Sequence, residues 1–222
     1  MFDELAIMKE VQLMYDQVGT YFSKTRKKQY GQKSYNWPIV QKYLDTLQAG
    51  ETVLDVGCGD GRLVSGLPQG VIYLGFDFSR VLLESARMTY PERQFLYGDV
   101  CDKSVWARLQ QYDAVFSIAL LHHLPTRKRQ LELVREMNQH VKTGGLLFLT
   151  TWNLWHEQMA QKGIERENLK AGEVIEMKFD QTPGRYVVAI DLPYLTELLS
   201  EAGWEVLKLG YDEQNLVAIA RG

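Results

Sequence analysis

The chain has 222 residues, 45% of them hydrophobic and 24% charged, which is enough for one α/β domain with a sizeable core. Its formal net charge of −3 argues against an extended surface for nucleic-acid phosphates. No apolar run approaches the ~18 residues that would span a bilayer, and the start of the chain lacks a basic signal sequence. The two cysteines form no C-x-x-C pair, so we expect a cytoplasmic protein without membrane association, disulfide framework or bound metal.

Apolar runs of strand length alternate with helical patterns along most of the chain. From the N-terminus, the predicted elements are strand 52–56, helix 62–67, strand 71–76, helix 80–90, strand 94–97, helix 104–110, strand 114–118, helix 128–141, strand 146–151, helix 193–202, and closing strands near 205–209 and 216–220. The run Lys142-Thr143-Gly144-Gly145 is typical of a glycine-terminated helix before a new strand. This alternation predicts a Rossmann-like α/β fold, with a seven-stranded, mostly parallel sheet covered by helices on both faces.

A glycine-rich turn follows the first predicted strand, in the run Asp55-Val56-Gly57-Cys58-Gly59-Asp60-Gly61. Glycines there allow positive φ and let backbone N–H groups approach a ligand without an intervening Cβ. Asp77 should end the second strand, where its carboxylate can accept both hydroxyls of a ribose. Asp55 would repel a pyrophosphate but favour a ligand that carries an ammonium and a sulfonium. The pattern therefore predicts a site for S-adenosylmethionine, with a purely structural turn as the alternative.

Further cofactor contacts are expected after the other strands, because ligands of an open parallel sheet lie over the carboxyl ends of its strands. Phe78 can instead be a core aromatic residue, and Asp99 can instead cap the next helix. The predicted cofactor-binding residues are Asp55, Gly57, Cys58, Gly59, Gly61, Asp77, Phe78, Ser79, Asp99, Val100, Ser117 and Ile118.

The pair His122-His123 follows the fourth predicted strand, at the mouth of the same site. A methyl group leaves the sulfonium of S-adenosylmethionine by in-line displacement. If this site catalyses that step, positioning alone can supply up to ~7–11 kcal/mol, and a base is needed only if the acceptor loses a proton. The pair is a candidate for that base or for positioning the acceptor. A polar pair of rings that caps the sheet edge is the alternative. Metal binding is not expected, because adjacent histidines would point apart and no third ligand is evident.

The turn at Asp55–Gly61 together with Asp77 resembles the class I S-adenosylmethionine-dependent methyltransferases. A narrower resemblance covers nearly the whole chain. Phe22-Ser23-Lys24-Thr25-Arg26, the run Ser117–Leu124 with its paired histidines, and Gly144-Gly145 followed by Trp152 are similar to the tRNA wobble-uridine methyltransferases, which esterify a carboxymethyl group on uridine.

The resemblance carries expectations of its own. It implies an antiparallel last strand, contact between Asp99 and the adenine amino group, tRNA as a partner and, as in some relatives, a small zinc-ribbon activator subunit. It also implies a single methyltransferase domain over residues 1–222. This domain would contain an N-terminal helical segment (1–50), a cofactor-binding half (51–152) and a substrate-side segment with the closing hairpin (153–222).

A carboxylate acceptor has a pKa near ~4 and is already ionised at neutral pH, so it needs a positive clamp rather than a base. Arg26, with Arg185 as a second candidate, is predicted to hold this anion through two parallel hydrogen bonds. Trp152 is predicted to stack on an extruded base. The alternatives are a solvated Arg26 and a core Trp152.

A basic stretch lies near the N-terminus and contains Lys24, Arg26, Lys27, Lys28 and Lys33, with Tyr30, Tyr35 and Trp37 close by. Arg127–Arg129 form a second, smaller basic cluster. Both are suited to contact with an RNA loop, although a solvated loop explains them equally well. Two other functions stay open: a small-molecule O- or N-methyltransferase that uses His122 or His123 as a base, and a non-catalytic cofactor-binding subunit.

Overall fold

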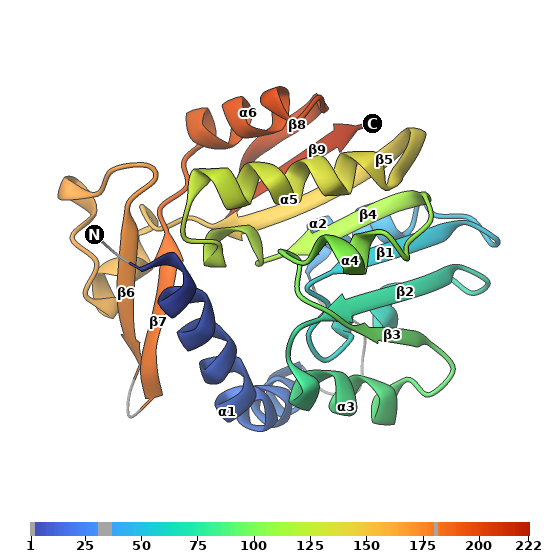
Figure 1. Ribbon diagram of the computed structural model, residues 1–222, viewed down its shortest axis with the longest axis horizontal. Helices are drawn as coiled ribbons and strands as arrows, with labels where there is room; N and C mark the ends of the chain where they lie inside the picture. Colours follow the sequence, from blue (N-terminus) through green and yellow to red (C-terminus); the bar gives the residue numbers. More distant parts are fainter. Residues whose placement is uncertain (1–2, 31–36, 180–181) are drawn as a thin grey trace.

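A computed structural model describes residues 3–30, 37–179 and 182–222 (Figure 1). Within these ranges, the side chains of residues 18, 20–30, 162, 178–179 and 182–184 are not described. The main sheet has seven strands in the order β3-β2-β1-β4-β5-β9-β8. These strands are β1 (Thr52–Val56), β2 (Ile72–Asp77), β3 (Gln94–Tyr97), β4 (Tyr112–Ile118), β5 (Val141–Trp152), β8 (Glu205–Asp212) and β9 (Asn215–Arg221).

The first five strands pair in parallel, and β9 runs antiparallel to both β5 and β8. The predicted fold class is therefore confirmed, including the antiparallel last strand. Both faces of the sheet are buried, as the side chains of β1 illustrate. Leu54 and Val56 belong to one hydrophobic core, whereas Val53 belongs to another on the opposite face, because successive side chains of a strand point to opposite faces.

Helices cover both faces (Figure 1). Residues of α5 (Arg127–Gln139) and α6 (Leu192–Glu201) share the core of Leu54, as does Trp106 at the end of the short α4 (Lys103–Trp106). Residues of α2 (Pro38–Leu44) and of the 3-10 helix η1 (Arg62–Gly66) share the core of Val53. Helix α3 (Arg80–Thr89) packs beside β2 and β3. The other 3-10 helices are η2 (Leu121–His123), η3 (Glu157–Lys162) and η4 (Arg166–Asn168).

A long N-terminal helix, α1 (Glu4–Tyr30), lies between α3 and a separate two-stranded hairpin (Figure 1). Ile7, Val11 and Met14 are buried and repeat at helical spacing, so they form the apolar face of α1. The hairpin consists of β6 (Val174–Phe179) and β7 (Thr182–Val188). Its small core contains Leu154, Met159, Ile164, Met177, Val187 and Ala189. This hairpin was not predicted from the sequence.

Several predicted boundaries were wrong. The predicted helix 62–67 is a short 3-10 helix that ends at Gly66. Val141 does not end α5 but begins β5, where it pairs with Tyr112. The run Lys142–Gly145 therefore lies inside β5, with Gly144 at a positive φ of 78° beside a register shift. Among the described residues, no helix combines the length and apolar character needed to cross a membrane.

Candidate cofactor and acceptor site

The glycine turn after β1 has the backbone geometry that its sequence predicts. Gly57, Gly59 and Gly61 all have positive φ, of 74°, 56° and 76°. A Cβ at Gly61 would lie 2.9 Å from the ring of Phe95, so glycine is also needed there for packing. Among the described residues, a Cβ at Gly59 would have only one neighbour within 4 Å, Leu82 at 3.9 Å. The backbone at Gly59 is therefore approachable in the way that a bound ligand requires.

Asp77 ends β2 and holds the glycine turn in place. One of its carboxylate oxygens accepts the backbone N–H of Gly59 at 2.9 Å, and the other accepts that of Ser79 at 2.8 Å. Burial raises the pKa of Asp77 to about 6, although these backbone bonds oppose the rise. A carboxylate has about four lone-pair sites, so each oxygen keeps capacity to accept one ribose hydroxyl.

Asp55 is enclosed behind the turn, and its carboxylate accepts the hydroxyl of Tyr73 at 2.8 Å. Burial raises the pKa of Asp55 to about 7, and the neighbouring charge of Asp77 adds to the rise. Burial also raises the pKa of the adjacent Cys58 thiol well above its usual value. A positively charged ligand at the turn would favour the ionised form of Asp55.

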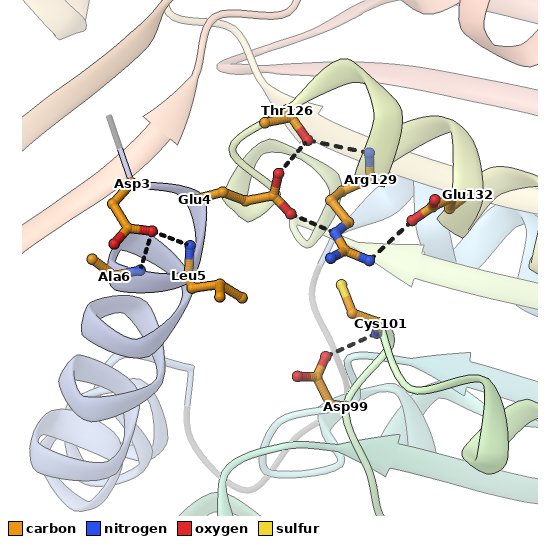
Figure 2. Close-up of polar contacts among 9 residues, drawn as sticks. All are labelled: Asp3, Glu4, Leu5, Ala6, Asp99, Cys101, Thr126, Arg129 and Glu132. Atoms are coloured by element: carbon orange, nitrogen blue, oxygen red, sulfur yellow. Dashed lines mark hydrogen bonds and ion pairs between the residues drawn. The ribbon is translucent and has the colours of Figure 1, made fainter. Parts of the chain in front are cut away.

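Asp99 follows β3 and is exposed, with one oxygen accepting the backbone N–H of Cys101 at 2.8 Å (Figure 2). The residue that caps α4 is Asp102, so Asp99 does not serve as that cap. Val100, the next residue, packs partly against the core. Figure 2 also shows how α1 begins near this loop, with Glu4 paired to Arg129 of α5.

The ends of the neighbouring strands form a cofactor rim, which we define as the glycine turn with Asp77, Asp99 and Ser117. The register places Asp55 opposite Gly75, and Asp77 opposite Tyr97, so the acids follow one another along one edge. The hydroxyl of Ser117 is buried and has no hydrogen-bond partner among the described residues. Ile118, the last residue of β4, is half-buried against the core. Three features of this rim fit S-adenosylmethionine. The carboxylate of Asp77 can accept further hydrogen bonds, the hydroxyl of Ser117 has no partner among the described residues, and the backbone at Gly59 is open to a ligand.

Phe78 and Ser79 form the turn after Asp77, and α1 rests on this turn. The ring of Phe78 meets the ring of Tyr15 edge to face, with centroids 6.1 Å apart. The hydroxyl of Ser79 donates to Asp16 at 2.7 Å. The carbonyl oxygen of Phe78 accepts from the side chain of Gln12 at 3.4 Å.

A second group of side chains, the acceptor cluster, lies beside the rim and consists of Tyr15, His122, His123, Trp152 and Arg185. His122 stacks on Trp152 with ring centroids 4.7 Å apart, and His123 lies 4.3 Å from His122. The guanidinium of Arg185 lies 5.1 Å from the centre of the Trp152 ring and 5.3 Å from that of Tyr15. The structure thus brings together four of the five predicted substrate-side residues.

The surroundings favour the neutral form of both histidines of this cluster. Burial, together with the charge of Arg185, lowers the pKa of His123 to about 3. Burial and its neighbours His123 and Arg185 lower the pKa of His122 well below its usual value. Nδ1 of His122 lies 3.0 Å from the hydroxyl of Thr151, and its Nε2 is buried without a hydrogen-bond partner among the described residues. Such weak bases are poorly matched to removing a proton at neutral pH.

The fifth predicted substrate-side residue, Arg26, lies in the C-terminal part of α1, and its side chain is outside the described part. The same holds for Lys24, Lys27 and Lys28, whereas Lys33 and Tyr35 lie outside the described residues altogether. Trp37, just after this stretch, donates from its indole N–H to Asp212 at 2.6 Å. This bond joins Trp37 to the β8–β9 hairpin. Asp212 and Asn215 form the last pair at the tip of that hairpin, and Asn215 pairs with Trp152.

Sequence reasoning missed two residues that the structure places at the site. Tyr73 supports Asp55, and Tyr15 contacts both Phe78, which follows Asp77 of the rim, and His123 of the acceptor cluster. Tyr15 could have been found from its spacing, because it lies one residue beyond the buried positions of α1 and therefore beside its apolar face. Tyr73 pairs with Val53, two residues before Asp55 on β1, so its side chain lies on the same face of the sheet as Asp55. This closeness can be predicted only once the register of the two strands is known.

Known proteins resemble this chain in sequence. The family model for the methyltransferase domain matches residues 27–209. A tRNA (carboxymethyluridine(34)-5-O)-methyltransferase of Mus musculus is 32% identical over 183 residues, covering 81% of this chain and 26% of that protein. The enzyme of the same name from Saccharomyces cerevisiae is 31% identical, covering 68% of this chain and 53% of that protein. The one from Schizosaccharomyces pombe is 27% identical and covers 95% of both chains.

Solved structures share the fold. A methyltransferase from Methanosarcina mazei, described as S-adenosylmethionine-dependent, superposes with a TM-score of 0.67 at 18% identity, covering 83% of this chain and 97% of that one. A Haloferax volcanii complex between the Trm112 methyltransferase activator and a methyltransferase gives a TM-score of 0.65 at 15% identity, covering 93% and 96%. The chain spans only about a quarter and about half of the length of the mouse and budding-yeast relatives. It belongs to the methyltransferase domain family and has the fold of enzymes that use S-adenosylmethionine.

Proposed function

We propose that this protein transfers a methyl group from S-adenosylmethionine to the carboxylate of a carboxymethyl group on the wobble uridine of tRNA. The cofactor supplies an electrophilic methyl group on a positively charged sulfur. Asp77 and Asp99 would hold its ribose and adenine, and the backbone of the glycine turn would approach its amino-acid part. The names of the relatives support the acceptor, since the mouse and both yeast proteins carry this activity in their names.

The observation that carries the proposal is the electrostatic character of the acceptor cluster. Arg185 is 4% exposed, and burial lowers the pKa of both histidines around it, which favours their neutral forms. This arrangement presents a positive charge but no effective base. It suits an acceptor that is already ionised, because a carboxylate loses no proton when it becomes a methyl ester. A guanidinium also matches the planar geometry of a carboxylate.

The same observation weighs against a small-molecule hydroxyl or amine acceptor. Such an acceptor must lose a proton, and His123, with a pKa of about 3, is a weak base for that step. One face of the Trp152 ring already stacks on His122, so an extruded uracil could stack only on the opposite face of that ring. We infer that Trp152 contributes to the wall around the acceptor more than to a stacking platform.

The test is to incubate the protein with methyl-labelled cofactor and tRNA from a strain that lacks the protein. We expect label on one nucleoside of the tRNA, and we expect mild alkali to release it because a methyl ester is hydrolysed by base. Alkali-stable label would contradict a carboxylate acceptor. Label on small molecules alone would favour the second function, and absence of transfer to any acceptor would favour a non-catalytic subunit.

Arg185→Met should lower methyl transfer at least about tenfold while leaving cofactor affinity unchanged, because one charge-assisted hydrogen bond is typically worth about 1.5–3 kcal/mol. Arg135→Met is the matched control, since Arg135 of α5 pairs with Glu201 on the surface and should not affect the reaction. Equal activity of the two variants would remove Arg185 from the acceptor site.

Two partners follow from the proposal. Contact between the basic stretch and tRNA predicts binding that weakens with salt, and replacing Lys27 and Lys28 by Ala should reduce the slope by about 0.7–0.9 for each phosphate that these lysines neutralise. An unchanged slope would place the RNA elsewhere.

A small zinc-ribbon activator is the second partner, supported by the fold shared with the Haloferax volcanii complex. Full activity of the purified chain alone would argue against it. A tRNA acceptor agrees with the cytoplasmic location expected from the sequence.

A further inference from the structure

One face of α1 rests on the turn that carries the ribose-binding acid. Gln12, Tyr15 and Asp16 are spaced as neighbours on a helix surface, and all three contact Phe78 or Ser79. These two residues directly follow Asp77, whose carboxylate binds the backbone of both Gly59 and Ser79. The position of this face of α1 is therefore linked to the geometry of the cofactor rim.

Tyr15 also contacts two other members of the acceptor cluster, His123 and Arg185. Its hydroxyl lies 2.8 Å from Nε2 of His123, and the two rings meet edge to face with centroids 5.4 Å apart. The guanidinium of Arg185 lies over the same tyrosine ring. Tyr15 therefore touches the cofactor side of the site through Phe78 and the acceptor side through His123 and Arg185.

The direction of the hydrogen bond between Tyr15 and His123 is set by the other ring nitrogen. Nδ1 of His123 lies 3.3 Å from the backbone carbonyl oxygen of Tyr186, which can only accept a hydrogen bond. Because the buried ring is neutral, its single proton is on Nδ1. Nε2 is therefore an acceptor, and the hydroxyl of Tyr15 donates to it. This chain of bonds runs from α1 through His123 to β7, the strand that carries Arg185.

We propose that Tyr15 is a positioning residue that sets the distance between the bound methyl donor and the acceptor carboxylate. Its hydroxyl fixes His123 against β7, its ring supports Arg185, and its contact with Phe78 ties both to the cofactor rim. This inference rests on the proposed function, in which Arg185 holds the acceptor. Small errors in such positioning can cost about a hundredfold in rate, so the effect should appear mainly in kcat.

Two variants separate the hydroxyl of Tyr15 from its ring. Tyr15→Phe keeps the ring, so we expect kcat to fall about tenfold or more while the KM for tRNA and the Kd for S-adenosylhomocysteine change less than about twofold. Tyr15→Leu also removes the aromatic support of Arg185, which should raise the KM for tRNA by a further factor of about 2 to 30. Tyr194→Phe is the matched control, because it removes a tyrosine hydroxyl bond to Gln130, outside both the rim and the acceptor cluster.

A loss of stability alone would give a different pattern. If Tyr15→Phe had the same kcat as the unchanged protein, the inference would be overturned. The same conclusion would follow if Tyr15→Phe and Tyr194→Phe lowered the melting temperature and kcat in parallel, because the effect would then be purely structural. A fall in kcat for Tyr15→Phe alone, with cofactor affinity kept, supports the inference.

A second measurement does not depend on the acceptor. In protein labelled with nitrogen-15 at histidine, the resonances of His123 should report the Nδ1–H tautomer and should shift when S-adenosylhomocysteine binds. In Tyr15→Phe, this ligand-induced shift should be lost while the ligand still binds. A shift that persists in Tyr15→Phe, or its absence in the unchanged protein, would overturn the coupling. Failure of the proposed function would show differently, as absence of transfer to tRNA with the histidine response intact.

Discussion

Replacing Asp77 by Asn tests whether the acid at the end of β2 binds the cofactor. Each oxygen of its carboxylate accepts one backbone N–H, from Gly59 and from Ser79. Asparagine has a similar shape, but its NH2 group cannot accept either bond or a ribose hydroxyl. The loss of one charge-assisted hydrogen bond is worth about 1.5–3 kcal/mol, so the cofactor Kd should rise about 10- to 150-fold.

Stability should change much less than affinity in this variant. Burial of the Asp77 carboxylate is unfavourable, as its pKa of about 6 shows, and the neutral amide removes this penalty while it loses a backbone bond. Calorimetric titration with S-adenosylhomocysteine at pH 8 measures the affinity, and thermal unfolding measures the stability. At this pH the carboxylate of the unchanged protein is ionised.

Asp113→Asn is the control for this prediction. Asp113 accepts the backbone N–H of Thr52 at 2.8 Å, but both residues lie near the amino ends of β4 and β1, away from the rim. This variant should lose stability and keep its affinity. An unchanged Kd in Asp77→Asn, or an equal rise in both variants, would refute the placement of the ribose.

Three further predictions concern the same rim. Gly61→Ala should lower the melting temperature more than Gly144→Ala. Both glycines have positive φ, but only at Gly61 would the added Cβ crowd an aromatic ring, which costs about 1–3 kcal/mol. Equal shifts in the two variants would contradict this prediction. The raised pKa values of Asp55 and Asp77 mean that the folded state keeps protons which the unfolded state releases above pH ~4, so these groups lower stability as pH rises toward 7. Cofactor affinity should rise over pH 5 to 8 as both acids ionise, and pH-independent binding measured by titration would exclude their role. Ser117→Ala should leave melting of the free protein unchanged or raise it, because the buried hydroxyl lacks a partner among the described residues, and should weaken cofactor binding; a marked loss of stability would show an unrecognised bond.

The elements of the main sheet could be predicted because each carries a local signal. Strands 52–56 and 94–97 were predicted with the bounds that the structure has, and the glycines of the turn have the positive φ that their spacing suggested. Boundaries were less predictable where an apolar residue suits two elements equally. Val141 fits the end of a helix and the start of a strand, and only its pairing with Tyr112 makes it the first residue of β5.

The hairpin β6–β7 was not predicted, although Ile175-Glu176-Met177-Lys178-Phe179 alternates apolar and polar residues as a half-buried strand does. Its core also takes Leu154, Met159 and Ile164 from the segment before the hairpin, so no single periodic pattern marks the whole set in the sequence. Arg185 could be named as a candidate from the resemblance. Its burial and its position over Tyr15 and Trp152 required the hairpin.

The sequence by itself determined where the predicted cofactor-binding residues lie, because they follow consecutive strands and a parallel sheet gathers the carboxyl ends of its strands at one edge. The alternation of strand and helix patterns predicted the fold class, the resemblance of the motifs predicted the family, and both are confirmed. The tertiary structure alone decided the acceptor half, where Tyr15 bonds to a histidine 108 residues away and Arg185 comes from a separate sheet. It also decided the protonation of that half, since the pKa of a histidine depends on burial and nearby charge, which only packing of distant segments creates.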